Sequence, residues 1–213
     1  MSCPICERRM PKRFCPAKGE YICAICCGTQ REVIIDCTPD CPHLIAAHRY
    51  EIEHRKPVDP KNIPFPDLEF SVEILRRNQD LLSALGLSIL KFARENAAAC
   101  DPEILTALTA LADTYRTLES GIYFEREPDA PLPRALYRQL SEFLQKIKKQ
   151  EAQQTGFSRL KDSEIFRLIV FLLRVGTRET NGRPRSRAFI DSLQAQFPQA
   201  ADKETKDARI ILP

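Results

Sequence analysis

Apolar residues recur at helical spacing through most of the chain after its first third. Between residues 68 and 98 they lie three or four positions apart, with one wider step, which predicts an amphipathic helix. Similar stripes follow in residues 104–118, 136–147, 165–175 and 189–197. Helices with one apolar face must bury that face against a neighbour. The segments therefore predict a helical bundle, with antiparallel packing as the simplest arrangement.

Two acidic segments mark expected helix starts. Asp101 is expected to cap the helix that follows it, because Pro102 suits a first helical position and an acidic residue comes next. Residues 162–164, Asp-Ser-Glu, are expected to cap the strongly apolar helix after them in the same way. Both segments support separate helices rather than one continuous element.

Prolines divide the chain into two parts. Four of them lie within residues 57–67, and such a run cannot continue a helix, so this segment predicts an extended linker. It separates residues 1–56, which end in a predicted helix over 42–55, from a helical bundle predicted over 68–200. Residues 201–213 predict a polar tail. Because the linker has few apolar side chains, we expect the two parts to unfold separately.

Cysteines dominate the first part. Eight of the nine lie within the first 41 residues, as C-x2-C, a single residue, C-x2-C-C and C-x3-C: Cys3, Cys6, Cys15, Cys23, Cys26, Cys27, Cys37 and Cys41. Eight thiolates satisfy two tetrahedral zinc ions. The N-terminus has neither the basic nor the apolar region of a secretory signal, so we expect a cytoplasmic protein with reduced thiols. The sequence predicts a mainly α protein, a two-zinc finger followed by a helical bundle, and disulfide, iron–sulfur or redox use of the thiols is the alternative.

The spacing favours one division of these cysteines between two ions. Sixteen residues separate the two C-x2-C pairs, Cys3/Cys6 and Cys23/Cys26, a spacing typical of zinc ribbons and treble clefs. The preferred division therefore gives one ion these two pairs, and the second ion the remaining four: Cys15, Cys27, Cys37 and Cys41. The other division unites the first pair with Cys37 and Cys41 on one ion, and leaves Cys15, Cys23, Cys26 and Cys27 for the second.

Four further residues carry side chains that can bind a metal ion or act as thiols. His43 and His48 follow the last cysteine of the cluster and are reserve ligands, although His48 is more simply a solvated helix histidine. His54 is expected on the surface. Cys100 stands alone before a helix start, and we expect it to act as a small buried apolar residue.

The order of the cysteines resembles that of the two-zinc cross-brace fingers of the HIT and MYND families. The resemblance covers residues 1–50, which contain two knuckles and then a C-x3-C beside a helix. Three features depart from the family pattern: Cys15 has no partner at C-x2-C spacing, Cys26 and Cys27 are adjacent, and the final pair replaces a histidine and a cysteine. The resemblance implies protein–protein or assembly work.

Composition and motifs narrow the expected function. The formal net charge of +3 is too small to indicate nucleic-acid binding by bulk electrostatics, and no apolar run has the length of a bilayer span. Two centres of four thiolates would leave no open coordination position, and no catalytic motif is present, so we expect no enzyme. Arg183, Arg185 and Arg187 surround a glycine-containing turn with few acidic neighbours and are the candidate phosphate contacts.

The sequence therefore predicts a zinc-binding adaptor or assembly protein that contacts another protein. The alternative is a nucleic-acid-binding regulatory protein, and a second alternative is a thiol-based redox or metal sensor. No membrane partner is expected.

Overall fold

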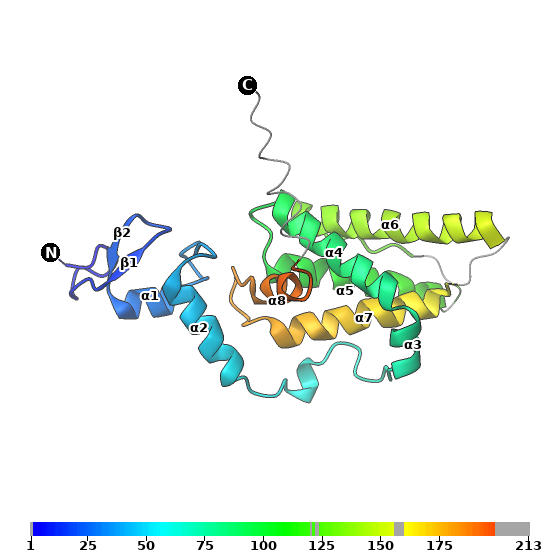
Figure 1. Ribbon diagram of the computed structural model, residues 1–213, viewed down its shortest axis with the longest axis horizontal. Coiled ribbons are helices and arrows are strands. Elements are labelled where there is room, and N and C mark those ends of the chain that lie inside the picture. Colours follow the sequence, from blue (N-terminus) through cyan, green and yellow to red (C-terminus); the bar gives the residue numbers. More distant parts are fainter. Residues whose placement is uncertain (1, 120, 122–123, 156–159, 199–213) are drawn as a thin grey trace, which may run out of the picture.

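The computed structural model describes residues 2–119, 121, 124–155 and 160–198, and for residues 119, 154 and 155 the backbone alone (Figure 1). Within these residues the protein is mainly helical. A cysteine cluster lies at the N-terminal end and a helical bundle follows it, which confirms the predicted fold class. Tail residues 201–213 lie outside the described part. No helix in the described residues is both long and apolar enough to cross a bilayer.

The N-terminal part contains a hairpin and two helices. Strands β1 (Arg13–Cys15) and β2 (Glu20–Ile22) pair antiparallel, and Gly19 in the turn between them has a φ of +66°, a value that favours glycine. Helix α1 (Ala24–Gln30) follows β2 directly. Helix α2 (Pro42–Glu53) begins after Cys41 with proline at its first position, close to the predicted bounds of 42–55.

The segment between the two parts is anchored to the bundle. It contains the short 3-10 helix η1 (Pro60–Asn62), and beyond it the side chain of Arg174 donates to the carbonyl oxygens of Pro64 (2.9 Å), Phe65 and Leu68 (3.0 Å). The ring of Phe65 meets that of Phe166 edge to face at 5.4 Å. The linker therefore carries apolar and polar contacts that its proline content did not predict.

The bundle consists of helices α3 (Val72–Arg77), α4 (Gln79–Glu95), α5 (Asp101–Glu119), α6 (Pro131–Thr155), α7 (Asp162–Glu179) and α8 (Ala188–Gln196). The helix predicted over 68–98 is interrupted at Asn78, whose side-chain amide donates to the carbonyl of Ile74 at 3.0 Å and so ends α3. Local capping by an asparagine thus overrides the apolar periodicity there.

Helices α5 and α7 form the centre of the bundle, with α6 against α5 and α8 against α4 and α7 (Figure 1). A close approach at Gly176 of α7 fixes this packing. A Cβ atom at that position would lie 2.6 Å from Leu105 of α5 and 2.9 Å from Phe189 of α8. Only glycine fits there without moving a core side chain.

Asp101 joins two helices in a way that the sequence did not predict. Its carboxylate accepts hydrogen bonds from Ser186 Oγ (2.6 Å) and from the backbone N–H groups of Phe189 (3.1 Å) and Ile190 (3.3 Å). It therefore caps α8 and not the helix in which it stands. The predicted cap at residues 162–164 is also wrong, because the N-cap of α7 is Lys161, which makes no side-chain cap hydrogen bond.

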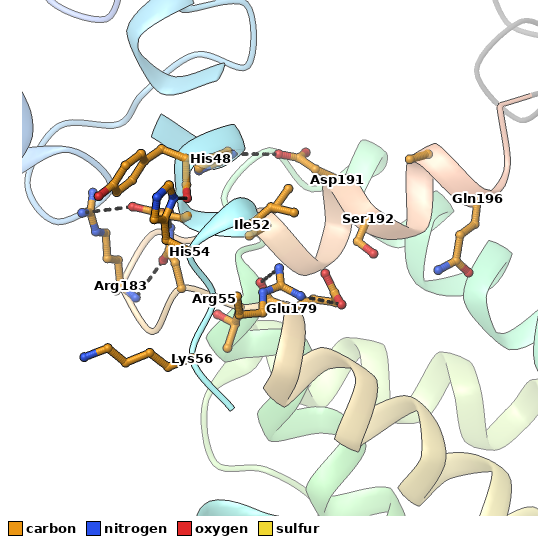
Figure 2. Close-up of a pocket in the computed structure, with 16 residues that line it drawn as sticks. His48, Ile52, His54, Arg55, Lys56, Glu179, Arg183, Asp191, Ser192 and Gln196 are labelled. Atoms are coloured by element: carbon orange, nitrogen blue, oxygen red, sulfur yellow. Dashed lines mark hydrogen bonds and ion pairs between the residues drawn. The ribbon is translucent and has the colours of Figure 1, made fainter. Parts of the chain in front are cut away.

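The N-terminal part meets the bundle where α2 approaches α8. Figure 2 shows His48 of α2 directed toward Asp191 of α8, with 3.8 Å between His48 Nδ1 and the carboxylate. The two parts are therefore in contact through side chains as well as through the linker.

Candidate metal centre

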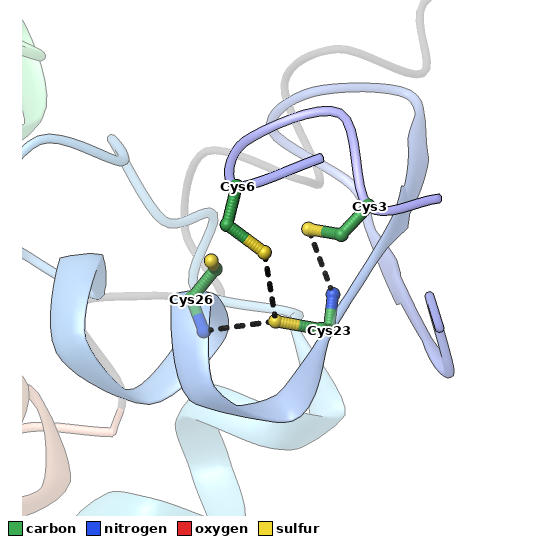
Figure 3. Close-up of side chains that lie close together, drawn as sticks. All are labelled: Cys3, Cys6, Cys23 and Cys26. Atoms are coloured by element: carbon green, nitrogen blue, oxygen red, sulfur yellow. Dashed lines mark hydrogen bonds between the residues drawn. The ribbon is translucent and has the colours of Figure 1, made fainter. Parts of the chain in front are cut away.

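A tight turn presents the first two cysteines. The N–H of Glu7 donates to the carbonyl of Cys3 at 2.7 Å, and the N–H of Cys3 donates to the carbonyl of Arg9 at 2.8 Å. Glu7 has a φ of +53°, a left-handed conformation that is uncommon for a residue with a side chain. The turn places Cys3 and Cys6 so that both sulfurs lie on its inner side (Figure 3).

The hairpin and α1 present the second two cysteines. Cys23 is the N-cap of α1, and its sulfur accepts a hydrogen bond from the N–H of Cys26 at 3.4 Å. The buried Ile22 immediately before it closes the hairpin onto the small apolar core of this part. The C-x2-C spacing therefore spans the start of a helix, which the sequence did not predict over residues 24–30.

The four sulfurs of Cys3, Cys6, Cys23 and Cys26 lie within 4.8 Å of one another (Figure 3). The Sγ atoms of Cys6 and Cys23 are 3.9 Å apart, and the N–H of Cys23 donates to Cys3 Sγ at 3.2 Å. All of these cysteines are free thiols. Four convergent sulfurs with amide donors form a ligand set that fits a tetrahedral metal ion, and the preferred division of the sequence places these four cysteines together.

The pKa values of two thiols in this group are shifted in opposite directions. The N–H of Arg8, aided by that of Arg9, lowers the pKa of Cys6 to about 6. Burial raises the pKa of Cys26 to about 12, and hydrogen bonding to the neighbouring sulfurs adds to that effect. Four adjacent thiols cannot all ionise without a compensating cation. A bound metal ion would supply that charge, and its binding would release protons.

The other four candidate ligands are not assembled in the same way. Cys15, Cys27 and Cys37 pack against the core around the first group, and Cys41 is the N-cap of α2. In the part of the chain that the structure describes, no three of these four sulfurs converge within 4.8 Å. The second ion therefore stays a prediction, and the division that joins Cys3 and Cys6 to the C-x3-C pair is not the one assembled.

The reserve ligands lie elsewhere. His43 is half-buried, and burial lowers its pKa, with the charges of Arg13 and Arg31 adding to the shift. His48 is not a solvated helix histidine, since its Nε2 lies 3.1 Å from the carboxylate of Glu32 and its side chain is largely covered. His54 is exposed, as predicted. These histidines contribute nothing to the four-cysteine group.

Glu32 forms a buried junction between the N-terminal part and the bundle. It is 2% exposed and has a φ of +53°. Its carboxylate accepts hydrogen bonds from His48 (3.1 Å) and from Asn181 Nδ2 (2.8 Å), and Arg183 lies 4.0 Å away. Its carbonyl accepts the N–H of Arg185 at 2.8 Å. A buried carboxylate with this many donors is satisfied and ties the two parts together.

Glu32 and His48 each stabilise the charged form of the other. Although burial opposes the shift, the hydrogen bond from His48 lowers the pKa of Glu32 below its usual value. That hydrogen bond in turn raises the pKa of His48. The two groups therefore form an ion pair that is shielded from solvent, where charge-assisted hydrogen bonds are strongest.

The three arginines that are candidate phosphate contacts are engaged within the chain. Arg183 pairs with Glu51 (3.4 Å) and Arg185 pairs with Asp36 (3.3 Å). Arg187 donates to a main-chain carbonyl in the loop between α4 and α5 (2.6 Å). The expectation that few acidic residues oppose them is wrong, because the acidic partners come from the N-terminal part of the chain.

A cleft of about 760 Å³ opens at this junction, between the C-terminal half of α2, the end of α7 and one face of α8 (Figure 2). Its walls include His48, His54, Arg55 and Asp191. Arg55 forms an ion pair with Glu179 at 2.7 Å. The sequence did not predict Glu32 or this cleft, because the segments that form them lie far apart in the chain. The run of arginines after α7 was the available signal, since clustered like charges need acidic partners.

Knuckle, hairpin and helix together define a closed four-cysteine centre that could hold a metal ion. Comparison of the chain with protein-family models, with curated proteins and with solved structures finds no match. The four-cysteine group and the junction around Glu32 are therefore the features from which function is inferred.

Proposed function

We propose that this protein is a zinc-binding, non-enzymatic adaptor that contacts another protein through its N-terminal finger, residues 1–56. Four cysteine sulfurs favour zinc, because zinc is not redox-active and forms tetrahedral sites with thiolate ligands. The order of knuckle, hairpin and helix is that of a treble-clef finger, in keeping with the resemblance to cross-brace fingers. A metal with four protein ligands has no open position for a substrate, which favours a structural role.

The observation that carries this proposal is the distribution of exposed apolar side chains. Among the described residues, twelve large hydrophobic side chains are exposed, and nine of them lie between residues 10 and 52. The bundle buries its apolar residues in one continuous core. Apolar groups that stay exposed together on a small domain mark interaction surfaces. The finger is therefore the part of the chain that a partner protein would cover.

A second zinc ion belongs to the proposal. Cys15 and Cys41 are buried, and the charges of both sulfurs act on Cys37, whose pKa is raised first by burial. Arg31 is also buried, and its Nε has no hydrogen-bond partner among the described residues. A zinc ion with four thiolates has a net charge of about −2, which would balance this guanidinium. Metal binding would then draw the remaining sulfurs together.

Two ion pairs weigh against the nucleic-acid alternative. Arg183 and Arg185 are paired with acidic side chains of the finger, and those pairs would have to break before either side chain could contact phosphate. A redox sensor is also disfavoured, because Cys26 belongs to the four-cysteine group and not to a free pair with Cys27.

Affinity capture with the full-length, zinc-loaded chain tests the proposal. We expect a protein partner that is retained after nuclease treatment and then binds the purified chain directly. Cys23→Ser should lose both one zinc ion and that partner, whereas the matched thiol substitution Cys100→Ser should keep both. A partner that disappears with nuclease would support nucleic-acid binding instead. Direct binding that survives the loss of zinc would show that the finger is not the contact surface.

A further inference from the structure

The hairpin of the finger displays two aromatic side chains to solvent. Phe14 of β1 and Tyr21 of β2 are directly opposite each other, and their rings meet edge to face with centroids 5.5 Å apart. They are 46% and 59% exposed. Their neighbours Cys15 and Ile22 are buried, and successive side chains of a strand point to opposite faces. Strand alternation therefore holds both rings on the outer face.

The hairpin and the turn that precedes it are together strongly basic. Residues 8–21 contain five basic side chains and one acidic side chain, a net charge of +4, against +3 for the whole chain. Lys12 lies two positions before Phe14, and its N–H donates to the carbonyl of Ile22 at 3.0 Å, which extends the strand pairing to it; strand alternation therefore places Lys12 on the same side as Phe14. Arg8, Arg9 and Lys18 are also exposed. Positive charge and exposed apolar area thus occur together.

None of these four cations has an acidic partner among the described residues. This distinguishes them from Arg183 and Arg185, which form ion pairs within the chain. The hairpin lies at the end of the molecule away from the bundle (Figure 1), and its two rings and these four cations are exposed. The charges remain available to a second molecule.

We propose that this aromatic-basic face, formed by Phe14, Tyr21, Arg8, Arg9, Lys12 and Lys18, binds an acidic segment of the partner protein that carries an apolar side chain among its carboxylates. The inference rests on the proposed adaptor function and names the chemistry of the partner. The rings bury the apolar side chain, and the cations pair with the carboxylates around it. Aromatic anchors in a charged rim are the usual composition of a binding hot spot, and complementary charge speeds association.

A protein partner suits this face better than a single-stranded nucleic acid. Bases stack on ring faces that are open to them, whereas in this edge-to-face pair the edge of one ring covers a face of the other. Met10, between the basic residues, is 73% exposed, and a flexible thioether adapts to an irregular apolar surface. The apolar part of the face therefore favours packing with side chains.

Fluorescence anisotropy with a defined probe tests the inference on the full-length, zinc-loaded protein. The probe is a fluorescein-labelled peptide in which glutamates flank a Leu-Phe-Leu core, and the matched peptide has glutamine in place of every glutamate. We expect the acidic peptide to bind more tightly by about tenfold or more and to weaken as salt rises. The double substitution Phe14→Ser with Tyr21→Ser should weaken it by about tenfold or more.

Two variants complete the design. Charge reversal by Lys12→Glu with Lys18→Glu should weaken the acidic peptide, whereas Val72→Ser, which changes an exposed apolar side chain on α3, should not. Zinc content should be unchanged in all of them, because the substituted side chains point away from the cysteines. That measurement separates loss of the face from loss of the fold.

Three results would overturn the inference. These are no binding of the acidic peptide, binding that the ring substitutions leave unchanged, and tight binding of an oligo-deoxythymidine strand that the same substitutions abolish. The adaptor function is judged separately. If the ring variant still retains the captured partner protein, the aromatic-basic face is wrong while the adaptor function stands.

Discussion

Replacing the buried carboxylate of Glu32 should weaken the contact between finger and bundle. Glu32→Gln keeps the shape of the side chain but removes its charge, which leaves His48 and Arg183 facing a neutral group. A hydrogen bond to a charged group contributes about 1.5–3 kcal/mol, and the loss of one partner of a buried pair costs about 3–5 kcal/mol. Because both cations keep some exposure to solvent, we expect a loss of about 2–3 kcal/mol in the free energy of unfolding.

Glu51 provides a matched control. It pairs with the same Arg183 at 3.4 Å, but its side chain is 32% exposed, against 3% for Glu32. Ion pairs open to water contribute about 0–1 kcal/mol, so Glu51→Gln should lower the free energy of unfolding by no more than that. The two variants differ in burial and not in the charge that they remove.

Chemical denaturation of the zinc-loaded full chain measures this effect through two signals. Circular dichroism reports the bundle helices, and a chromogenic chelator reports release of zinc from the finger. The sequence predicts that the two parts unfold separately, but in the wild-type chain we now expect the two transitions to lie close together, because Glu32 joins the finger to the bundle and Phe65 joins the linker to it. In Glu32→Gln the finger should release zinc earlier. If Glu32→Gln and Glu51→Gln have equal effects, the buried junction does not couple the two parts.

Three further predictions concern the metal, the core and pH. Elemental analysis should find two zinc ions in the wild-type chain, one in Cys23→Ser and two in Cys100→Ser; one ion in the wild-type chain would remove the second site. Gly176→Ala should lower the free energy of unfolding by about 1–3 kcal/mol, as in other overpacked cores, because the added Cβ would clash with side chains of α5 and α8. An unchanged denaturation midpoint would contradict this packing. Glu32 raises the pKa of His48 above 6.5, so the stabilising effect of His48 is complete below that pH and is lost as pH rises through the raised pKa. His48→Gln should therefore lower the free energy of unfolding more at about pH 6 than at about pH 9. An equal effect at both pH values would exclude the ion pair.

The helical bundle was predictable because the apolar periodicity of each helix is visible within its own segment of the sequence. Periodicity located α5, α6, α7 and α8 without reference to their neighbours. The errors arose where a polar side chain has a distant or unexpected partner. Asp101 looks like a cap for its own helix, yet the N–H groups that it accepts belong to α8, nearly ninety residues later. Local pattern contains no information about such a partner.

The metal centre was predictable for a similar reason, since the pair spacings of its four cysteines are local. In the second set only Cys37 and Cys41 have a paired spacing, Cys15 and Cys27 have none, and the sulfurs do not converge in the described chain. Glu32 was missed because a glutamate is ordinarily exposed. Its partner Asn181 lies 149 residues away, so its burial follows only from the way in which the two parts meet.

The four-cysteine group connects the hairpin to the helix that leads toward the bundle. On one side it fixes the hairpin, because Cys23 follows β2 directly and Cys3 accepts its N–H, and the hairpin displays Phe14 and Tyr21. On the other side it fixes α1, which leads from Cys26 to the turn that buries Glu32 against the bundle. The four cysteines are thus the fixed point from which both surfaces extend. A small finger without a large core depends on its metal for such rigidity, so the metal would hold the exposed aromatic-basic face in a defined position relative to the bundle.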